Sequence, residues 1–514
     1  MGLSHLVPQL SPIPCLALGL VVTLILHSTK RYSLFRDPLR HIPGPPLARW
    51  TGLWLAYQVR MGRRYVAVDQ AHKEYGPVVR ITPTHVSFSD PAALSVIYAQ
   101  GSAALQKSPF YDAFVGATAS VFSTRVRSEH ALKRRQVAPA FSVRSLEGLV
   151  PILHGRMTVF LNKLQATIDD NKEDGYVDIR EWLHYFTFDT ISDLLFGEPV
   201  GMIAQGSDLI EVKRPNGRMY KEHIIPIMDD REHVAVVVGV MPSLRFIASW
   251  LPDPFFIRGR KSTEGMDLLA RQRVEHRVAA GTQRDDILSR FVDARLKDTD
   301  EVTISAEQIT DLTAESLTLL IAGSQSTATS SSVALHQVCA NPRVYVTLMA
   351  ELERAVPPDE LPTYDHVKNL PYLQACITEA LRHHGTNAVG LPRLAPPGGV
   401  TCCGTHFPEG TEMSVPSYTL HHNENIWGDP ENYRPERWLE NPALHRTTLM
   451  FGMGPRGCIG KHLATMEIQI ILSTLLLLYD VELKSPVLVS FERFQREPLD
   501  VLVHLTRRKH ARSP

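Results

Sequence analysis

Several features that would indicate a specialised chemistry are missing from this 514-residue chain. Its 54 basic residues are balanced by 54 acidic residues, so there is no positive excess of the kind that attracts nucleic acid. We also find no internal repeat, no long linker and no second regime of composition beyond the N-terminal region. The chain is therefore predicted to form one large globular unit without a nucleic-acid partner.

Cysteine is scarce, with six residues in the whole chain, and their irregular spacing contains no C-x-x-C or zinc-binding pattern. In a chain of this length such cysteines are typical of free thiols in a reducing compartment. The Asn-x-Ser/Thr acceptor of N-glycosylation is absent as well. This is expected if the bulk of the chain never enters a secretory lumen.

The N-terminus carries a long, mostly apolar stretch without charged side chains. Residues 6–27 have no charged side chain, close to the roughly 20 residues that span a bilayer. No Lys or Arg precedes this stretch and no small-x-small site follows it, which argues against the alternative of a cleaved secretory peptide. Lys30, Arg31, Arg36 and Arg40 follow, and by the positive-inside rule they keep that side cytosolic. We predict a membrane anchor at 1–27, a basic and proline-rich hinge at 28–47, and one functional domain at 48–514.

Helical periodicity dominates the globular part. It is clearest around Tyr65–Tyr75, Glu129–Ala138, Asp178–Phe196, Asp285–Arg295 and His366–His384. Alternation in Val78–Thr82 and His85–Ser89 predicts a β-hairpin, and short alternation returns near Leu499–Leu505. The stretch from Gly201 to Lys261 mixes proline, glycine and apolar runs and allows no single assignment, mobile helices being one option. The predicted fold class is mainly α with small β-sheets (α+β).

One predicted helix is unusually long. Ser305 to Gln308 fits a capping box, and no proline follows until Pro342. The roughly 36 residues between them would extend about 54 Å, enough to cross the whole globule.

The segment Phe451–Gly460, FGMGPRGCIG, carries most of the functional information. Cys458 stands among four glycines, which allow a backbone to approach a flat ligand closely. A thiolate on such a loop can bind haem iron, and backbone N–H groups of the turn can hydrogen-bond its sulfur. Arg456 is placed to meet an anion such as a haem propionate. The alternative is a glycine-rich turn with an incidental cysteine.

This segment resembles the haem-ligand loop of cytochrome P-450 monooxygenases, F-x-x-G-x-R-x-C-x-G, at every fixed position. The resemblance implies a cytochrome P-450 fold, a single haem-binding domain around a long central helix. It also implies haem b as cofactor, Cys458 as the axial iron ligand, and Phe451 as a further haem contact. His41 to Pro46 is similar to the proline-rich linker of microsomal, fungal-type members.

No G-x-G-x-x-G follows a predicted strand, so we do not expect the chain to bind the nicotinamide itself. The resemblance implies that electrons come from NADPH through a separate cytochrome P-450 reductase, with cytochrome b5 as a further donor. It also implies a single-pass protein of the endoplasmic reticulum membrane with its catalytic domain on the cytosolic side.

The middle of the long helix, Ala322–Thr327, resembles the oxygen-binding segment of the family, [AG]-G-x-[DE]-T-[TS]. A glycine inside a helix costs up to about 1 kcal/mol, and at Gly323 the reason is room for the cofactor and dioxygen or close packing of another helix. Gln325 stands where an acid is usual and Ser326 where threonine is usual. The resemblance assigns oxygen activation to Ser326, Thr327 and Gln325, with protons arriving through the two hydroxyls and water. Gln325→Asp with Ser326→Thr is then expected to improve the coupling of NADPH use to product.

Glu379 and Arg382 form a Glu-x-x-Arg pair on one helix face, which alone would be an ordinary surface ion pair. The family has this pair buried, with a third member in a Pro-x-Arg motif that Arg437 matches here. The resemblance implies a structural network that holds the cysteine loop, and removing one member would strand a buried charge at about 3–5 kcal/mol.

Basic residues are expected at the haem propionates. His130 and Arg134, four apart on one predicted helix, look like the [WH]-x-x-x-R contacts of the family. Arg393, which follows Leu391-Pro392, resembles another contact, and Arg456 completes the set. The alternative for each is a solvated surface residue.

A finer resemblance is to fungal benzoate 4-monooxygenases. It rests on Gly62–Tyr65, Ala71–Gly76, Phe110–Val115 and Val415–His421. One wall of an apolar substrate pocket is assigned to Phe110, Tyr111, Phe114 and Phe122, with ordinary core packing as the alternative. We interpret the nearby cations Lys107, Arg125 and Arg127 as surface residues.

The sequence thus predicts a membrane-anchored haem-thiolate monooxygenase that inserts one oxygen atom of dioxygen into a small aromatic substrate, by benzoate-type hydroxylation or in secondary metabolism. A haem-thiolate isomerase or dehydratase that works without reductase remains open because of the departures at Gln325 and Ser326. A haem-binding protein without turnover is the third interpretation.

Overall fold

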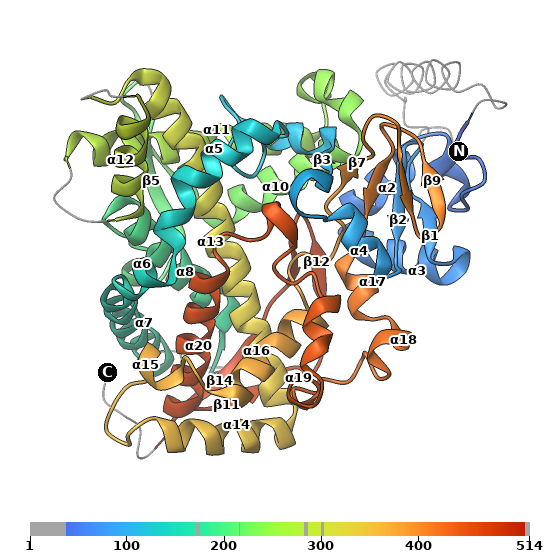
Figure 1. Ribbon diagram of the computed structural model, residues 1–514. Coiled ribbons are helices and arrows are strands. Elements are labelled where there is room, and N and C mark those ends of the chain that lie inside the picture. The colour runs from blue at the N-terminus through green and yellow to red at the C-terminus, as the bar shows by residue number, and fades with distance from the viewer. Residues whose placement is uncertain (1–36, 171–174, 215, 282–285, 300–302, 509–514) are drawn as a thin grey trace, which may run out of the picture.

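The structure is a computed structural model that describes residues 37–170, 175–214, 216–281, 286–299 and 303–508. The predicted anchor at 1–27 lies outside the described residues. The described part is dominated by helices, and strands β1 (Val78–Arg80), β2 (His85–Phe88), β3 (Gln106–Lys107) and β7 (Arg393–Leu394) lie together at one side, on the right in Figure 1. This agrees with the predicted fold class.

The longer helices form most of the molecule. They are α3 (Arg64–Tyr75), α5 (Arg127–Val137), α7 (Val150–Asp170), α8 (Ile179–Phe196), α10 (Ile224–Val240), α11 (Pro254–Ala279), α12 (Ile287–Thr299), α13 (Ala306–Ala340), α14 (Pro342–Ala355), α16 (Pro371–His383) and α20 (Lys461–Leu478). The shorter helices are α2 (Leu53–Arg60), α4 (Ala92–Ile97), α6 (Val143–Glu147), α9 (Met202–Gln205), α15 (Tyr364–Val367), α17 (Ser417–His421), α18 (Glu424–Trp427) and α19 (Glu436–Glu440).

The strands form two small sheets and three hairpins. The larger sheet has the order β1 (Val78–Arg80), β2 (His85–Phe88), β10 (Glu412–Ser414), β7 (Arg393–Leu394), β3 (Gln106–Lys107). The smaller has the order β11 (Tyr479–Leu483), β14 (Leu502–Arg507), β4 (Tyr176–Asp178). The hairpins are β5 (Leu209–Lys213) with β6 (Met219–His223), β8 (Val400–Cys402) with β9 (Thr405–Phe407), and β12 (Ser490–Glu492) with β13 (Arg496–Pro498).

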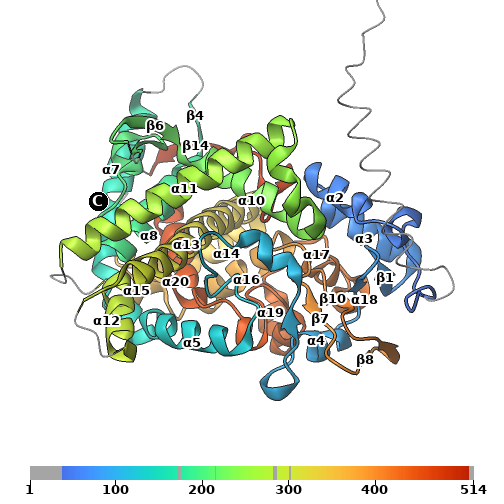
Figure 2. The ribbon, with the colours of Figure 1, turned by 90° about the horizontal axis from the view of Figure 1, so that it is seen from above.

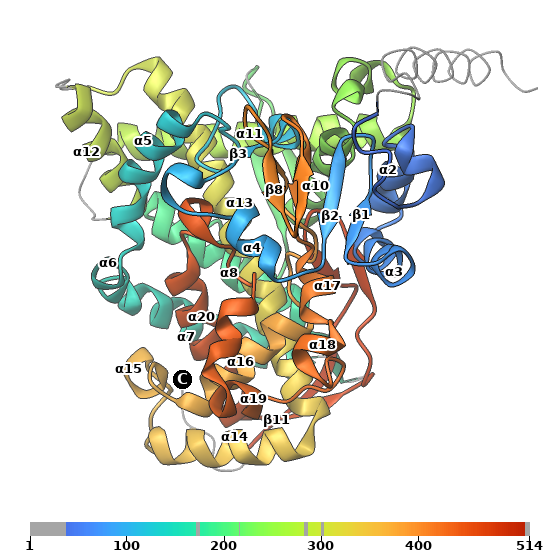
Figure 3. The same cartoon turned by 45° about the vertical axis from the view of Figure 1, so that its right-hand side comes forward.

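The predicted β1–β2 hairpin is confirmed, with antiparallel register Val79 opposite Ser87. Figure 3 shows this sheet beside α2 and α3. The single helical pattern predicted over 366–384 was wrong, because two helices occupy it. Thr363 caps the short α15, and Pro371 begins α16 at a position where its missing N–H costs nothing.

The stretch that allowed no assignment contains the β5–β6 hairpin and the buried helix α10. The signal for the hairpin was Asn216-Gly217, since Gly217 adopts φ 83°, as a tight hairpin turn requires. α10 is apolar on most sides, which is why its period was hard to read.

α13 is the central element, as predicted. Ser305 Oγ accepts from Gln308 N at 3.2 Å and Gln308 Oε1 accepts from Ser305 N at 2.9 Å, so the capping box is formed. Figure 2, seen from above, shows α10 and α11 lying across α13. α8 packs closely along it, and Thr187 Oγ1 donates to Ser324 O at 3.0 Å.

The packing of α8 explains Gly323. A Cβ at this position would lie 2.9 Å from Ile191 Cγ1, too close for a side chain. Of the two explanations for this helical glycine, close packing of another helix is therefore the one that the geometry supports.

Two further features concern the membrane and hinge predictions. Among the described residues, α20 alone is long and apolar enough to cross a membrane, and 78% of that segment is buried inside the molecule. It is a core helix. The described end of the predicted hinge is fastened to β1, because Arg80 N donates to Pro43 O at 2.8 Å and Arg80 Nη1 pairs with Asp37 Oδ2 at 2.6 Å.

Candidate active site

The Cys458 loop is a compact turn that leads into α20. Cys458 N donates to Phe451 O at 2.7 Å, which closes the turn. Gly454 has φ 70°, and a Cβ there would lie 2.6 Å from Tyr98 O, so no other residue fits without strain. Arg134 Nη1 donates to Gly457 O at 2.7 Å and ties the loop to α5.

The environment of the Cys458 sulfur has opposing effects. Burial raises the pKa of the thiol, while the N–H groups of Gly460 and Lys461 and the guanidinium of Arg134 lower it. Those N–H groups belong to the first turn of α20, where the helix dipole favours negative charge. The sulfur is thus placed to carry the charge of a thiolate, the form that ligates metal.

Five basic side chains gather around this loop: Lys107, His130, Arg134, Arg393 and Arg456. Four of them line the same cavity of about 210 Å³ as Cys458, and Arg393 lines an adjoining cavity together with His130 and Arg456. Among the described residues, no carboxylate lies within ion-pair distance of any of the five. We call them the basic cluster.

The members of the basic cluster depress one another's protonation. Burial, then Arg456 and Lys107, lower the pKa of His130 to about 3, so the imidazole is neutral. Burial, then Arg456 and Arg393, lower the pKa of Lys107 well below its usual value. Lys107, His130 and Arg393 are buried, and Arg134 and Arg456 are half-buried. Basic groups withdrawn from water without a nearby carboxylate favour the binding of an anionic ligand. Two haem propionates beside a thiolate loop fit this donor set.

Other contacts hold the cluster in place. Arg393 Nη1 donates to Tyr111 Oη at 2.7 Å, and its guanidinium stacks 5.2 Å from the centre of the Tyr98 ring. Arg456 Nη1 donates to Thr124 O at 2.9 Å. Lys107 Nζ donates to Phe122 O, and it lies 4.5 Å from the centre of the Tyr111 ring.

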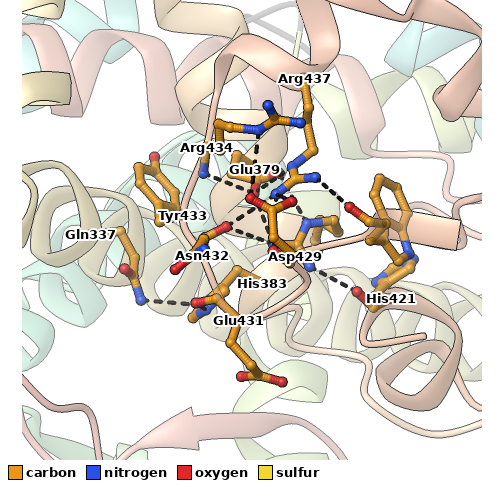
Figure 4. A network of polar contacts seen from close by, with 12 residues as sticks. Gln337, Glu379, His383, His421, Asp429, Glu431, Asn432, Tyr433, Arg434 and Arg437 are labelled. Carbon is orange, nitrogen blue, oxygen red and sulfur yellow. Dashed lines mark hydrogen bonds and ion pairs between the residues drawn. The ribbon is translucent and has the colours of Figure 1, made fainter. Parts of the chain in front are cut away.

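The predicted Glu379 network is present and buried (Figure 4). Glu379 Oε1 lies 2.8 Å from Arg382 Nη2 and 3.0 Å from Arg437 Nε, with all three side chains at most 2% exposed. Trp438 Nε1 donates to Glu379 Oε2 at 2.9 Å and Arg434 N to Oε1 at 3.1 Å. The carboxylate is thereby fully hydrogen-bonded.

His421 connects this network to the cysteine loop. Arg382 Nη1 donates to His421 O at 2.7 Å, and His421 Nε2 accepts from Leu449 N at 3.1 Å. Leu449 stands two residues before Phe451. Burial, then Arg382, lower the pKa of His421 to about 3, which keeps Nε2 unprotonated as an acceptor. The network therefore positions the loop through one imidazole.

The cavity that contains Cys458 has aromatic walls. Phe114, Phe122 and Phe494 line it, and their ring centres lie 5.2–5.7 Å apart in edge-on contacts. Of the four aromatics predicted for this wall, Phe114 and Phe122 are correct. Tyr111 is fully buried and its hydroxyl accepts a hydrogen bond from Arg393, so it does not line this cavity. Phe110 lines a separate cavity between α2, the larger sheet and α10.

The cations near this wall behave differently from one another. Lys107 was predicted at the surface, and this is wrong, since it is 3% exposed and part of the basic cluster. Arg125 is half-buried and pairs with Asp112 at 2.8 Å, and Arg127 is exposed.

The three predicted oxygen-site residues on α13 point in different directions. Ser326 is half-buried and its Oγ donates to Ala322 O at 2.7 Å, on the face where Ala322 lines the cavity. Thr327 is buried and bonds to Glu467 of α20, whose pKa burial raises to about 8. Gln325 is fully buried, and its Nε2 donates to Asp229 Oδ1 of α10 at 2.7 Å.

Several functional candidates were missed by reasoning from sequence. Ala322, Glu232 and Gln495 line the Cys458 cavity, and Asp229 meets Gln325. Ala322 lies inside the recognised motif and could have been found there. Asp229 and Glu232 are on the helix that had no readable period, so only the tertiary arrangement reveals them.

Comparison with known proteins agrees with this geometry. The cytochrome P450 family model matches residues 43–504. A benzoate 4-monooxygenase of Aspergillus niger is 38% identical over 509 residues, covering 96% of this chain and 97% of the relative. Cytochrome P450 monooxygenases of Talaromyces stipitatus and Penicillium brasilianum are each 29% identical, covering 91% and 93% of this chain and 89% and 95% of the relatives.

Proposed function

The chain belongs to the cytochrome P450 family, and we propose that it is a membrane-anchored monooxygenase, fed by NADPH through a reductase, that hydroxylates a small aromatic compound. Membership of the family implies a haem-thiolate iron cofactor. When bound, that cofactor supplies the activation of dioxygen. The single observation that carries the proposal is the thiol of Cys458 in an aromatic-walled cavity, beside buried and half-buried basic side chains that have no carboxylate partner among the described residues.

The proposed cofactor contacts follow from the basic cluster. Cys458 Sγ is the iron ligand, stabilised as thiolate by the N–H groups at the start of α20. His130, Arg134, Arg393 and Arg456 hold the two propionates, and the buried Lys107 joins them. Phe451 contributes to the thiolate loop through its carbonyl oxygen, which accepts from Cys458 N. Gly323 contributes indirectly, because it allows α8 to pack closely against α13.

Oxygen activation also requires protons. Ser326 is the proposed hydroxyl that would orient water at the cavity, because it shares a helix face with Ala322 of the cavity wall. Thr327 and Gln325 act behind it, since one bonds to Glu467 and the other to Asp229. A positioned proton donor of this kind typically contributes 10²–10⁴-fold to rate.

The substrate is proposed to be a small aromatic acid, aldehyde or alcohol. The walls of Phe114, Phe122 and Phe494 suit an aromatic ring. The relative named a benzoate 4-monooxygenase supports the acid, and the other relatives leave a role in secondary metabolism open.

Membrane attachment is proposed through an anchor at 1–27 and a hinge at 28–47, with the catalytic domain at 48–514 facing the cytosol at the endoplasmic reticulum. Exposed aromatic side chains support this placement. Phe246 of η5 (Pro242–Phe246) and Trp250 of η6 (Ala248–Trp250) are 80% and 85% exposed. Residues of the η5 turn line one cavity together with residues 50–53, so the turn lies beside the first described residues of the chain. Aromatic residues of this kind favour the membrane interface.

Electron supply is proposed to come from a cytochrome P-450 reductase, with cytochrome b5 as a further donor. Gly452, Gly454 and Gly457 have G-x-G-x-x-G spacing, but the turn follows η7 (Pro442–Thr447) and a loop. Because a dinucleotide fingerprint follows a strand, this turn does not serve the nicotinamide.

The test is a product screen with purified protein, reductase, NADPH and a panel of small aromatic acids, aldehydes and alcohols. We expect one hydroxylated product, dependent on both NADPH and reductase. A reaction that needs neither would favour an isomerase. Haem binding without turnover on any compound of the panel, given active reductase, would contradict the proposal.

A further inference from the structure

The residue that replaces the usual acid of α13 contacts an acid on another helix. Gln325 Nε2 donates to Asp229 Oδ1 at 2.7 Å, and both side chains are buried. Asp229 Oδ2 lies 3.1 Å from Arg493 Nη2, at the tip of the β12–β13 hairpin. α13 has Gln325 at the position where an acid is usual, and the amide of Gln325 holds a carboxyl group, that of Asp229, on the neighbouring helix α10.

A second acid lies one turn further along α10, on the same face. Glu232 is 5% exposed and lines the Cys458 cavity, and its Oε2 is buried without a hydrogen-bond partner among the described residues. Gln495 Oε1, in the wall of the same cavity, is also buried and unpartnered among those residues, as is Gln325 Oε1. Buried acceptors of this kind are usually satisfied by water. Water bound to these three oxygen atoms would connect Asp229 with the cavity.

The charges around this pair keep protons on it. Burial, then Glu497, raise the pKa of Asp229 to about 7, against the lowering effect of Arg493 and Arg180. Burial, then Glu497, raise the pKa of Glu232 to about 8, against Arg231 and Arg493, with Asp229 adding to the rise. Glu497 is itself paired with Arg180 at 2.8 Å. Both acids thus titrate near neutral pH, where a proton donor works best.

We propose that α10 carries the proton-holding acids of the oxygen site, with Glu232 facing the cavity and Asp229, positioned by Gln325, behind it. The proposal rests on the proposed monooxygenase function. It concerns residues that lie outside the oxygen-binding motif of α13.

The proton balance is simple. Inserting one atom of dioxygen into a C–H bond consumes two electrons and two protons and releases the second atom as water. NADPH supplies the electrons through the reductase. Glu232 releases the proton of its carboxyl group to water in the cavity, which Ser326 Oγ orients. Asp229 returns a proton to the Glu232 carboxylate through water and is reprotonated from solvent beside Arg493, whose side chain is 24% exposed.

This arrangement revises the expected effect of restoring the family motif. Gln325→Asp would remove the amide that now donates to Asp229 Oδ1 at 2.7 Å. The new carboxyl group, one methylene shorter, would face Asp229 without a hydrogen bond to hold it, and the nearby like charge would oppose ionisation of either acid. Gln325→Asp with Ser326→Thr is therefore expected to reduce coupling.

The first experiment measures product formed per NADPH, with peroxide assayed in parallel, for Glu232→Gln and Asp229→Asn in the haem-bound enzyme. The matched control is Glu412→Gln, a carboxyl group of β10 whose pKa burial also raises to about 7 and which lies away from the Cys458 cavity. We expect product formation to fall about 10²-fold in Glu232→Gln, the lower end for a lost proton donor. Peroxide should rise, with an intermediate loss in Asp229→Asn and no change in the control.

An isosteric exchange distinguishes proton supply from mere structural support. Gln325→Glu combined with Asp229→Asn moves the acid back to α13 and keeps a hydrogen bond between the two positions. The double variant has as many buried acids as the native protein and one more than Asp229→Asn. It should regain part of the coupling that Asp229→Asn loses. Failure of the double variant to exceed Asp229→Asn, with the carbon monoxide spectrum intact, would contradict the proposal.

An infrared titration gives a readout that does not depend on turnover. Because Glu412 and Glu467 also titrate near pH 7 and pH 8, the bands are assigned from difference spectra between native protein and variants. The signal lost in Asp229→Asn should titrate near pH 7 and the signal lost in Glu232→Gln near pH 8. A Glu232 carboxyl that is already ionised at pH 6 would overturn the proposal.

Two further outcomes distinguish this proposal from a proton source near Thr327 and from a failure of the proposed function. Uncoupling in Glu467→Gln together with normal coupling in Glu232→Gln would place the proton source on the Thr327 side of α13 and refute the α10 assignment. Absence of product from the native enzyme would contradict the proposed function itself, and no variant is needed to see it.

Discussion

Removing the carboxylate of Glu379 should destabilise the protein far more than removing the half-buried carboxylate of Glu436, whose arginine partner is exposed. In Glu379→Gln, the guanidinium groups of Arg382 and Arg437 lose their shared charge partner while remaining at most 2% exposed. Stranding a buried charge costs about 3–5 kcal/mol. Unfolding entropy of about 2.1 cal/mol/K per residue amounts to roughly 1 kcal/mol/K for this chain. The expected decrease in Tm is therefore roughly 3–5 °C.

Glu436→Gln is the matched control. Glu436 also binds an arginine, Arg343, but that arginine side chain is 62% exposed, so its loss should cost under about 1 kcal/mol. Thermal unfolding of the haem-bound proteins, followed by circular dichroism, gives both values. Because His421 links Arg382 to Leu449, Glu379→Gln should also lower the fraction of haem that shows the thiolate band with carbon monoxide. Equal Tm decreases in the two variants would refute the reasoning.

Three more predictions follow from the same structure. Deleting residues 1–27 should release the protein from membrane pellets into the soluble fraction with haem binding intact; loss of haem despite normal expression would show that this segment belongs to the fold. Gln325→Glu alone should lower Tm more than Gln325→Glu combined with Asp229→Asn, because only the single variant places a glutamate against the Asp229 carboxyl group. Equal Tm values in the two variants would contradict the 2.7 Å contact between positions 325 and 229. Since burial raises the folded pKa of Asp229 from 3.8 to about 7, the unfolded chain loses this proton first as pH rises. The native protein should therefore lose stability relative to Asp229→Asn between about pH 4 and pH 7, as denaturant titration would show, and a constant difference would be inconsistent with a buried neutral acid.

The parts of the site that sequence could predict are those set by local spacing. The Cys458 turn, the capping box of α13 and the Glu-x-x-Arg pair each depend on residues a few positions apart. Their geometry follows from helix periodicity and from glycines that no other residue replaces. The basic cluster was largely predicted for the same reason, since His130 and Arg134 share one turn of α5.

The remainder depends on tertiary contacts between distant segments. Asp229 meets Gln325 across 96 positions in sequence, so neither residue indicates the other. Lys107 looks like a surface cation in sequence, but the fold leaves it 3% exposed, in the wall of the same cavity as Arg134 and Arg456. The orientations of Ser326 and Thr327 differ because adjacent residues on a helix lie about 100° apart.

The most direct test of the central claim is the spectrum of the reduced carbon monoxide complex in the native protein and in Cys458→Ala. The thiolate of Cys458 is the proposed iron ligand, and the red-shifted Soret band would require a thiolate ligand on the haem iron. We predict that the native protein shows this band and that Cys458→Ala lacks it, while Cys376→Ala, a buried thiol away from the cavity, keeps it. Persistence of the band in Cys458→Ala would contradict the account.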